Sequence, residues 1–260
     1  VVASCGANCT KHVFTDAVQT HGARCLDGSP PGLYFRPGRG VGRRQFIIYS
    51  HGGSWCYKLT GADKTWDCAA RSKTYEGSSA PQYQSDLGPT RNNMAAGIMD
   101  PNCDMNPVFC EWSVVYLMYC DGMSFAGNRT EPHTLADGSL LWSRGRANLF
   151  ALYDRLLSPT LGFGLGDATR VIVTGASAGG FSAVYHCDRI RALVPAAIPL
   201  HCVSDAGFWP DFPDANGAHT WRAQVSMMVE LHNASGGLDA SCVGSHRDDP
   251  AFCAHPPNSL

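Results

Sequence analysis

The sequence predicts an α/β fold in which a mostly parallel sheet carries helices on both faces. Apolar runs at 45–50, 114–119, 171–174 and 196–200 have the composition of buried strands. Helical periodicity occurs between several of these runs, and strands that alternate with helices form mostly parallel sheets. The 260 residues contain no internal repeat and no interdomain linker, so we expect one domain over residues 1–260.

The first half of the chain combines turns, strands and one long polar segment. Residues 1–24 show little apolar periodicity and are predicted to be an irregular arm, and 26–32 carry turn-forming residues. Residues 57–111 are polar, poorly periodic and too long for a plain connection. We therefore expect 57–111 to be a disulfide-tied insertion that holds short helices.

Two long helices are predicted in the second half. Between Arg144 and Leu157, the apolar residues Leu149, Leu152, Tyr153 and Leu156 recur at helical spacing. This pattern indicates a helix with one apolar face against the sheet. A second helix is expected from about Gly179 to Leu193, directly after the strand at 171–174.

The motif Gly175-x-Ser177-x-Gly179 stands between that strand and that helix. In a nucleophile elbow, a serine at such a turn presents its hydroxyl to open space, and glycines flank it where a side chain would clash. We expect Ser177 to be a nucleophile and the backbone N–H of Ala178 to face an oxyanion. The alternative is an ordinary glycine-rich turn in a chain with 28 glycines.

A second glycine loop follows the strand at 45–50 and begins His51-Gly52-Gly53-Ser54. Such a loop is typical of the other half of an oxyanion hole, because glycines let the backbone approach a substrate with its N–H groups. His51 is expected to shape this loop rather than to act as a general base.

Composition excludes several classes of function. A net charge of −2 argues against a general nucleic-acid or membrane-surface binder. The chain has no run of 18 apolar residues, so no membrane span is predicted. The cysteine spacing fits no zinc pattern. We expect neither a cofactor nor a metal, and the oligomeric state stays open.

The 12 cysteines favour a secreted, disulfide-bonded protein of the cell exterior or cell wall. Sequons for N-glycosylation at Asn8, Asn128 and Asn233 support this, and free thiols in a cytosolic enzyme are the alternative. Because the chain begins Val-Val-Ala without Met, we expect a processed or partial sequence. Connectivity cannot be deduced from sequence, but the spacing favours the local pairs Cys56–Cys68, Cys103–Cys110, Cys187–Cys202 and Cys242–Cys253.

From about Arg24 to His255, the chain resembles the pectin acetylesterase family, which includes the Notum-type carboxylesterases. The Tyr-Cys-Asp-Gly and Ser-Asp-Ala-Gly blocks are specific to it, and the blocks look closer to the plant-type members than to Notum. The resemblance rests on residues 25–31, 52–56, 119–127, 174–180, 186–188 and 204–208, in the family's order.

This resemblance implies an α/β-hydrolase fold and ester hydrolysis through an acyl-enzyme on Ser177. The backbone N–H groups of Gly53, Ser54 and Ala178 would form the oxyanion hole. Two departures are His51, where the family usually has Glu, and the long segment between Cys56 and Cys68.

The family's triad Asp and His lie farther from the nucleophile than the 83 positions between Ser177 and Leu260 (260 − 177). The resemblance therefore implies that both are absent from this chain and that the sheet lacks its C-terminal strands. Weak substitutes are Asp205 as the acid and His255 as the base, although His255 has a surface-loop context. The other histidines after the nucleophile are His186, expected to pack near Cys187, and His201, His219, His232 and His246.

Three functions compete. The first is a serine carboxylesterase that removes acetyl groups from a cell-wall or extracellular polysaccharide such as pectin. The second is a catalytically inactive relative that keeps the pocket for binding, and the third is a Notum-like protein deacylase. An acetyl group needs a small pocket, whereas a long acyl chain needs an apolar tunnel, and the sequence does not show the depth of the pocket.

We predict that residues 1–260 expressed alone release acetate from an acetylated ester only slowly. An elbow and an oxyanion hole without a base leave only residual catalysis, about 10³–10⁴-fold over water in well-studied triads. Acetate release by the purified chain measures this. Efficient turnover that depends on Ser177 and on a histidine of this chain would contradict the prediction, and His255 and His219 would be mutated first.

Overall fold

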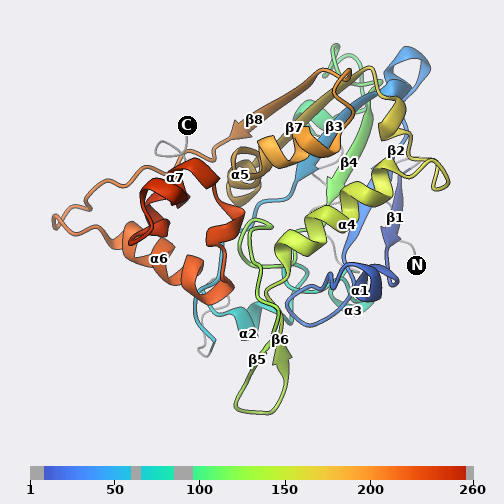
Figure 1. The fold of residues 1–260 in the computed structure, drawn as a ribbon. Coiled ribbons are helices and arrows are strands. Elements are labelled where there is room, and N and C mark those ends of the chain that lie inside the picture. Colours follow the sequence, from blue (N-terminus) through green and yellow to red (C-terminus); the bar gives the residue numbers. More distant parts are fainter. Residues whose placement is uncertain (1–8, 60–65, 85–95, 256–260) are drawn as a thin grey trace.

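The protein, shown as a computed structural model in Figure 1, is built around a six-stranded sheet with the order β1-β2-β4-β3-β7-β8. The structure describes residues 9–59, 66–84 and 96–255. β3, β4, β7 and β8 run parallel, and β1 and β2 pair antiparallel. The strands are β1 (Thr10–Val13), β2 (Gly32–Arg36), β3 (Gln45–Ser50), β4 (Ser113–Leu117), β7 (Arg170–Ala176) and β8 (Leu200–Asp205), with a separate pair β5 (His133–Thr134) and β6 (Leu140–Leu141).

The helices alternate with the parallel strands, as the sequence predicts. None of those in the described ranges is long and apolar enough to cross a membrane. The α-helices are α1 (Ala17–Thr20), α2 (Cys68–Arg71), α3 (Pro81–Gln84), α4 (Gly145–Leu157), α5 (Ala178–Leu193), α6 (Thr220–His232) and α7 (Ala240–Ser245). The 3₁₀ turns are η1 (Gly40–Arg44), η3 (Gly97–Met99), η4 (Leu165–Asp167), η5 (Ser235–Gly237) and η6 (Pro250–Ala254).

Two predicted elements differ from the structure. The apolar run at 196–200 forms a turn, and β8 begins only at its last residue, Leu200. Pro199 explains this shift, because proline has no N–H for a sheet ladder. The arm at 1–24 is not wholly irregular, since Thr10–Val13 pairs with β2 as an edge strand without any apolar periodicity of its own.

The two faces of the sheet are covered differently. α4 and α5 pack on one face, where Leu152 and Phe181 join one apolar cluster with strand residues such as Ile48. Figure 1 shows both helices across that face. On the other face, Ile47 and Tyr116 pack with Met99 of η3 and with Trp112, which belong to or border the 57–111 segment. Short helices in that segment were predicted, and α2, α3 and η3 confirm them in its described part.

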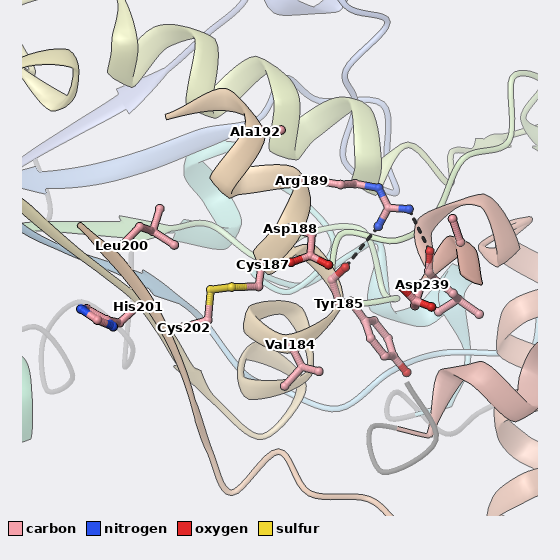
Figure 2. Close-up of a pocket in the computed structure, with 12 residues that line it drawn as sticks. Val184, Tyr185, Cys187, Asp188, Arg189, Ala192, Leu200, His201, Cys202 and Asp239 are labelled. Carbon is pink, nitrogen blue, oxygen red and sulfur yellow. Dashed lines mark hydrogen bonds between the residues drawn. A yellow bond between two sulfur atoms is a disulfide. The ribbon is translucent and has the colours of Figure 1, made fainter. Parts of the chain in front are cut away.

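An open groove of about 740 Å³ lies beside α5, between β8 and the turn before α7. Figure 2 shows the disulfide Cys187–Cys202 in its wall. The Arg189 guanidinium crosses the groove and donates hydrogen bonds to the carbonyls of Tyr185 and Leu238, at 3.1 and 2.8 Å. The groove lies on the flank of α5 and does not include Ser177 in its lining.

Within the described ranges, five disulfides join ten cysteines. All four predicted local pairs are confirmed, at Cys56–Cys68, Cys103–Cys110, Cys187–Cys202 and Cys242–Cys253. The fifth, Cys25–Cys120, spans 95 residues and was not predicted, because spacing gives no signal for a distant pair. Cys9 is also disulfide-bonded.

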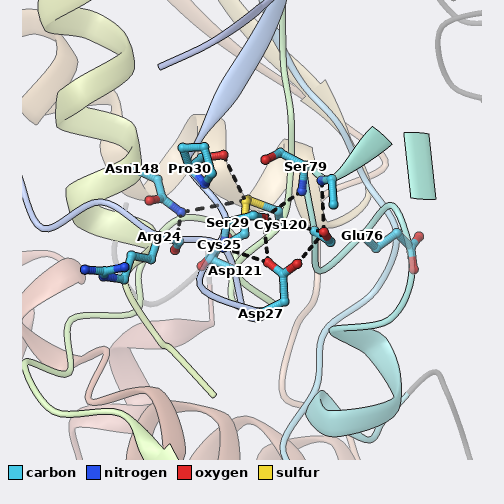
Figure 3. The surroundings of a disulfide bond; sticks show 12 residues. Arg24, Cys25, Asp27, Ser29, Pro30, Glu76, Ser79, Cys120, Asp121 and Asn148 are labelled. Carbon is cyan, nitrogen blue, oxygen red and sulfur yellow. Dashed lines mark hydrogen bonds between the residues drawn. A yellow bond between two sulfur atoms is a disulfide. The ribbon is translucent and has the colours of Figure 1, made fainter. Parts of the chain in front are cut away.

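The Cys25–Cys120 bridge joins the turn before β2 to the segment after β4 (Figure 3). Next to it, the Asp27 carboxylate accepts a hydrogen bond from the Ser29 N–H at 2.9 Å and one from the Ser78 hydroxyl at 2.5 Å. The bridge therefore belongs to a polar cluster that ties the start of the chain to the segment at 66–84.

Among the described disulfides, Cys25–Cys120 closes the longest loop and Cys103–Cys110 the shortest, and these lengths predict different contributions to the free energy of unfolding. In the chain-entropy account of disulfides, a loop of 95 residues stabilises by about 4–5 kcal/mol and a loop of 7 residues by about 2 kcal/mol. We expect the Cys25→Ala/Cys120→Ala variant to lose more stability than the matched Cys103→Ala/Cys110→Ala control. Urea unfolding followed by circular dichroism measures both. Equal losses would show that local strain or denatured-state structure outweighs loop length.

Candidate active site

The predicted site forms where the parallel strands end. Ser50 at the end of β3 lies opposite Gly175 of β7 and Leu117 of β4, and Asp205 of β8 lies opposite Ala176. The carboxyl ends of parallel strands share one edge of a sheet, and sites of α/β proteins form there. The segments that begin at His51, Tyr119, Ser177 and Ala206 therefore leave the sheet side by side.

Ser177 occupies a strained turn between β7 and α5. Its backbone has φ 55° and ψ −122°, a conformation that L-residues rarely adopt. A Cβ on Gly179 would lie 2.0 Å from the Ser50 carbonyl oxygen, and a Cβ on Gly175 would lie 2.4 Å from the same atom. The turn is therefore tight enough to require both glycines, as the motif predicts.

The second glycine loop lies directly against this turn. A Cβ on Gly52 would be 2.5 Å from the Ala176 carbonyl oxygen and 3.3 Å from the Cβ of Ser177. Gly53 and Ser54 both have positive φ, 122° and 59°. The structure thus places the loop that contains Gly53 and Ser54 against the turn of Ser177 and Ala178, and these three N–H groups have no acceptor within hydrogen-bonding distance in the described ranges.

The Ser124 hydroxyl connects the two halves of the site. It accepts a hydrogen bond from the Trp55 indole N–H and donates one to the Ala178 carbonyl, each at 2.7 Å. The Ser124 N–H donates to the Tyr119 hydroxyl at 3.2 Å, and that hydroxyl donates to the Ser54 carbonyl at 2.8 Å. The 119–125 block therefore holds the second glycine loop on one side and the start of α5 on the other.

This block is shaped by a buried carboxylate. Asp121 is fully buried and accepts hydrogen bonds from the N–H groups of Met123 and Phe125, at 3.3 and 3.0 Å. Burial raises the pKa of Asp121 to about 6, against the lowering effect of these hydrogen bonds. Gly145 is required here, because a Cβ would lie 2.0 Å from a carboxylate oxygen of Asp121.

His51 lies at the rim of the second glycine loop. Its ring packs against Tyr75 and Tyr116, with centroids 5.8 and 5.6 Å apart. Burial and the nearby Arg71 lower the pKa of His51 to about 4, so its ring is neutral at neutral pH. These ring contacts fit the expected role of shaping the loop, which stays a prediction.

Asp205 presents its backbone, not its carboxylate, to the elbow. Its carbonyl accepts a hydrogen bond from the Ser177 N–H at 3.0 Å. The residue ends β8 and is exposed, and no histidine in the described ranges hydrogen-bonds to its carboxylate. Its role as a substitute triad acid stays a prediction without a partner base.

His255 is buried, with 1% exposure, and the expected surface-loop context is wrong. Its Nδ1 donates to the Trp209 carbonyl at 3.3 Å, and burial lowers its pKa. The Cys242–Cys253 disulfide and the hydrogen bond from the Tyr185 hydroxyl to the Ala254 carbonyl close the chain around it. Sequence reasoning saw the flanking cysteine and prolines but not this packing.

The other histidines that follow Ser177 bond elsewhere. His219 pairs with Asp211 at 2.7 Å on the surface, and His246 stacks on Phe252. The buried His186 and His232 donate to the carbonyls of Ser124 and Cys56, at 3.0 and 2.8 Å. None of the histidines in the described ranges hydrogen-bonds to the Ser177 hydroxyl, so these residues do not assemble a general base there.

Two clusters have the composition of metal sites. They are Cys56–Cys68–His232 and Cys242–His246–Cys253, each with donor atoms within 4.8 Å of one another. In both, the two sulfurs are joined in a disulfide. Metal ligation needs thiolates, so the oxidised clusters offer one nitrogen ligand each.

Comparisons with known proteins identify the family of this chain. The family profile described as Pectinacetylesterase matches residues 6–260. The chain belongs to the pectin acetylesterase family. Pectin acetylesterase 5 of Arabidopsis thaliana is 34% identical over 247 residues, which cover 95% of this chain and 53% of that protein. Pectin acetylesterase 11 is 30% identical over 247 residues, with 95% and 58% coverage.

Notum proteins are also similar. Human palmitoleoyl-protein carboxylesterase Notum is 25% identical over 193 residues, covering 72% of this chain and 34% of Notum. The solved structure of the Wnt deacylase Notum from Drosophila superposes with a TM-score of 0.75 at 25% identity, over 96% of this chain and 67% of that one. This confirms the α/β-hydrolase-like fold class. The chain spans about half the length of the plant relatives it matches.

Ser124, Tyr119, Trp55 and Arg71 are the site residues that sequence reasoning missed. The first three lie in blocks that carried the family resemblance, but no chemical role was attached to them. Their strongest sequence signal is that the blocks 52–56 and 119–127, which carried the resemblance, each follow a predicted strand. Arg71 gave no signal, because it lies in the poorly periodic 57–111 segment.

The buried residues of the site predict a loss of stability in acid. Burial lowers the pKa of His186 to about 3 and of His232 to about 4, below the about 6.5 of an unfolded chain. Their contribution is therefore fully present above about pH 6.5 and is lost as the pH falls toward 4, because the unfolded chain binds the protons. Asp121, whose pKa is raised to about 6, has the opposite effect at pH values between the pKa of an unfolded aspartate and 6, because the folded protein binds the proton there. It therefore offsets one of the two protons.

His51, whose pKa is lowered to about 4, adds a third imidazole and leaves two net protons, so we expect the free energy of unfolding to fall by up to about 2.7 kcal/mol per pH unit between pH 6 and 4. Urea titrations at pH 7, 6, 5 and 4 measure this slope. His186→Gln removes one of the three imidazoles and should flatten it, whereas substitution of the exposed His201 should not. A stability that is independent of pH in this window would contradict the assignment.

Proposed function

We propose that this chain carries the nucleophile and the oxyanion hole of a secreted serine carboxylesterase that removes acetyl groups from a cell-wall or extracellular polysaccharide such as pectin. The Ser177 hydroxyl oxygen attacks the ester carbonyl, the ester C–O bond breaks and the sugar hydroxyl leaves with the serine proton. Water then hydrolyses the acyl-enzyme and releases acetate, and the N–H groups of Gly53, Ser54 and Ala178 stabilise the oxyanion in both steps. The observation that carries the proposal is the contact of the Gly52–Gly53 loop with the strained turn at Ser177. Such donors act on charge that develops in the transition state.

Family membership supports the class of reaction. Pectin acetylesterases and palmitoleoyl-protein carboxylesterases, the relatives that match this chain, are carboxylic ester hydrolases. The disulfides of the described residues support an oxidising compartment, and the sequons Asn128 and Asn233 suit a secreted glycoprotein. The sequon at Asn8 lies outside the described residues. No cofactor enters the proposed reaction.

A second candidate is a deacylase that acts on a lipidated protein. The superposition on the Wnt deacylase Notum from Drosophila favours it. The candidates differ in the acyl chain. A series of 4-nitrophenyl esters from acetate to decanoate separates them, since an acetylesterase loses kcat/KM as the chain lengthens and a deacylase gains it.

The third candidate is a catalytically inactive relative that only binds an ester or a polysaccharide. It is favoured by the absence, within the described ranges, of a histidine hydrogen-bonded to the Ser177 hydroxyl. The full-length product of the gene separates it from the enzymes. An inactive relative releases no acetate whether or not Ser177 is present.

We predict that Ser177→Ala in the full-length product of this gene lowers kcat for an acetyl ester by several orders of magnitude. Triad members act as a unit, so loss of the nucleophile leaves only residual catalysis. The matched control is Ser245→Ala, which alters an exposed serine at the end of α7. Retention of turnover by Ser177→Ala would remove Ser177 from the mechanism.

A further inference from the structure

A buried arginine lies behind the second glycine loop. Arg71 is the last residue of α2 and has no exposed surface. The helix is fixed at its start by the Asp67 carboxylate, which accepts hydrogen bonds from the N–H groups of Ala69 and Ala70. The Cys56–Cys68 disulfide ties the same helix to the chain just after the loop. Arg71 is thus held rigidly against the loop.

The guanidinium grips one peptide group of that loop. Its Nη2 donates to the Gly53 carbonyl at 2.6 Å, and its Nε donates to the Glu76 carbonyl at 3.3 Å. Its Nη1 pairs with the Glu76 carboxylate at 3.4 Å, and its Cζ lies 5.1 Å from the centroid of the Tyr119 ring. The short bond to Gly53 is charge-assisted, which makes it stronger than a neutral hydrogen bond.

The hydrogen bond to the Gly53 carbonyl also fixes the direction of the N–H on the other side of the same peptide. In a planar trans peptide, the C=O of one residue and the N–H of the next point in opposite directions. Because the Gly53 carbonyl points at Arg71, the Ser54 N–H of the same peptide points away from it. Within the described ranges, no group accepts a hydrogen bond from this N–H. Arg71 therefore fixes the direction of an N–H group that is available beside Ser177.

The loop needs such a constraint. Ser54 has φ 59°, a left-handed conformation that costs a non-glycine residue free energy and persists only where the surroundings enforce it. Tyr119 holds the next carbonyl, that of Ser54, at 2.8 Å. Two successive carbonyls are thus held by buried side chains, and a peptide flip would leave the Arg71 charge without its partner in the core.

We propose that Arg71 is a positioning residue for ester hydrolysis, which orients the Gly53–Ser54 peptide so that the Ser54 N–H faces the oxyanion. The inference rests on the proposed function at Ser177. Glu76 balances the buried charge, and it lies close to the loop, since a Cβ on Gly53 would be 2.2 Å from a Glu76 carboxylate oxygen. Arg71 touches no reacting atom, since it acts through the backbone of the loop.

The test uses Arg71→Lys and Arg71→Gln in the full-length product of the gene. Removing one oxyanion donor costs about 10²–10³ in kcat, so a misaligned donor should cost about tenfold to a hundredfold. We expect kcat to fall by this amount with KM changed less than about threefold, because the contact forms in the transition state. Affinity for a trifluoromethyl ketone, which forms an oxyanion on the serine, should fall in proportion to kcat/KM.

Arg24→Lys is the matched control, because Arg24 also stacks on an aromatic ring, that of Trp142, outside the site. It should leave kcat and the inhibitor affinity unchanged. Unfolding curves identify which variants fold. If neither Arg71 variant folds, the unaltered protein decides, because the Ser54 amide proton should shift downfield in NMR spectra when the trifluoromethyl ketone binds.

The outcomes separate two failures. If Ser177→Ala keeps full activity, the proposed function fails. If Ser177→Ala is inactive but folded Arg71→Lys and Arg71→Gln keep kcat and inhibitor affinity, the proposal for Arg71 alone is overturned. An unshifted Ser54 amide in the inhibited protein overturns it as well.

Discussion

The site depends on one hydroxyl group, that of Ser124, which receives the Trp55 indole N–H and donates to the Ala178 carbonyl. Trp55 follows the glycine loop, and Ala178 begins the helix behind Ser177. One oxygen atom therefore sets the distance between the two halves of the site. Ser124 is buried and has φ 50°, so its own position is strained and must be imposed from outside.

Disulfides and buried polar groups together hold the strained residues of the site in place. Ser54, Ser124, Phe125 and Ser177 all have positive φ, and such residues cost about 1–3 kcal/mol each. These four residues lie in the segments at the strand ends, and Cys25–Cys120 and Cys56–Cys68 anchor two of those segments. Buried donors such as Tyr119 satisfy the carbonyls of these segments. The sheet brings the strand ends to one edge, and the disulfides and buried hydrogen bonds fix the shape of the segments that follow the strands.

The fold class, the parallel strands and the two long helices could be predicted because periodicity and turn chemistry are local properties. The adjacency of Gly53 and Ser177 was also within reach, since both follow predicted parallel strands. Three features were not. Cys25–Cys120 joins distant residues, β1 owes its pairing to the backbone of β2, and the burial of His255 depends on the tertiary contacts of η6.

Arg71 lay beyond sequence reasoning for a different reason. Its segment has no periodicity, and both of its hydrogen bonds go to carbonyl oxygens, which every residue possesses. A side chain that binds backbone leaves no complementary residue to find in the sequence. The same holds for Ser124, whose partners are an indole and a carbonyl. Backbone-directed contacts are therefore the part of this site that a structure adds.

Two buried histidines make such backbone-directed contacts and do not serve as a catalytic base. His186 and His232 donate to the carbonyls of Ser124 and Cys56, which belong to the two segments that flank Ser177. Burial lowers the pKa of both, so they hold these carbonyls as neutral donors. A buried ammonium in their place would conflict with the low dielectric of the core unless it had a counter-charge of its own, as Arg71 has in Glu76. Neutral imidazoles avoid this conflict, which gives a physical reason for histidines that support the site without acting as its base.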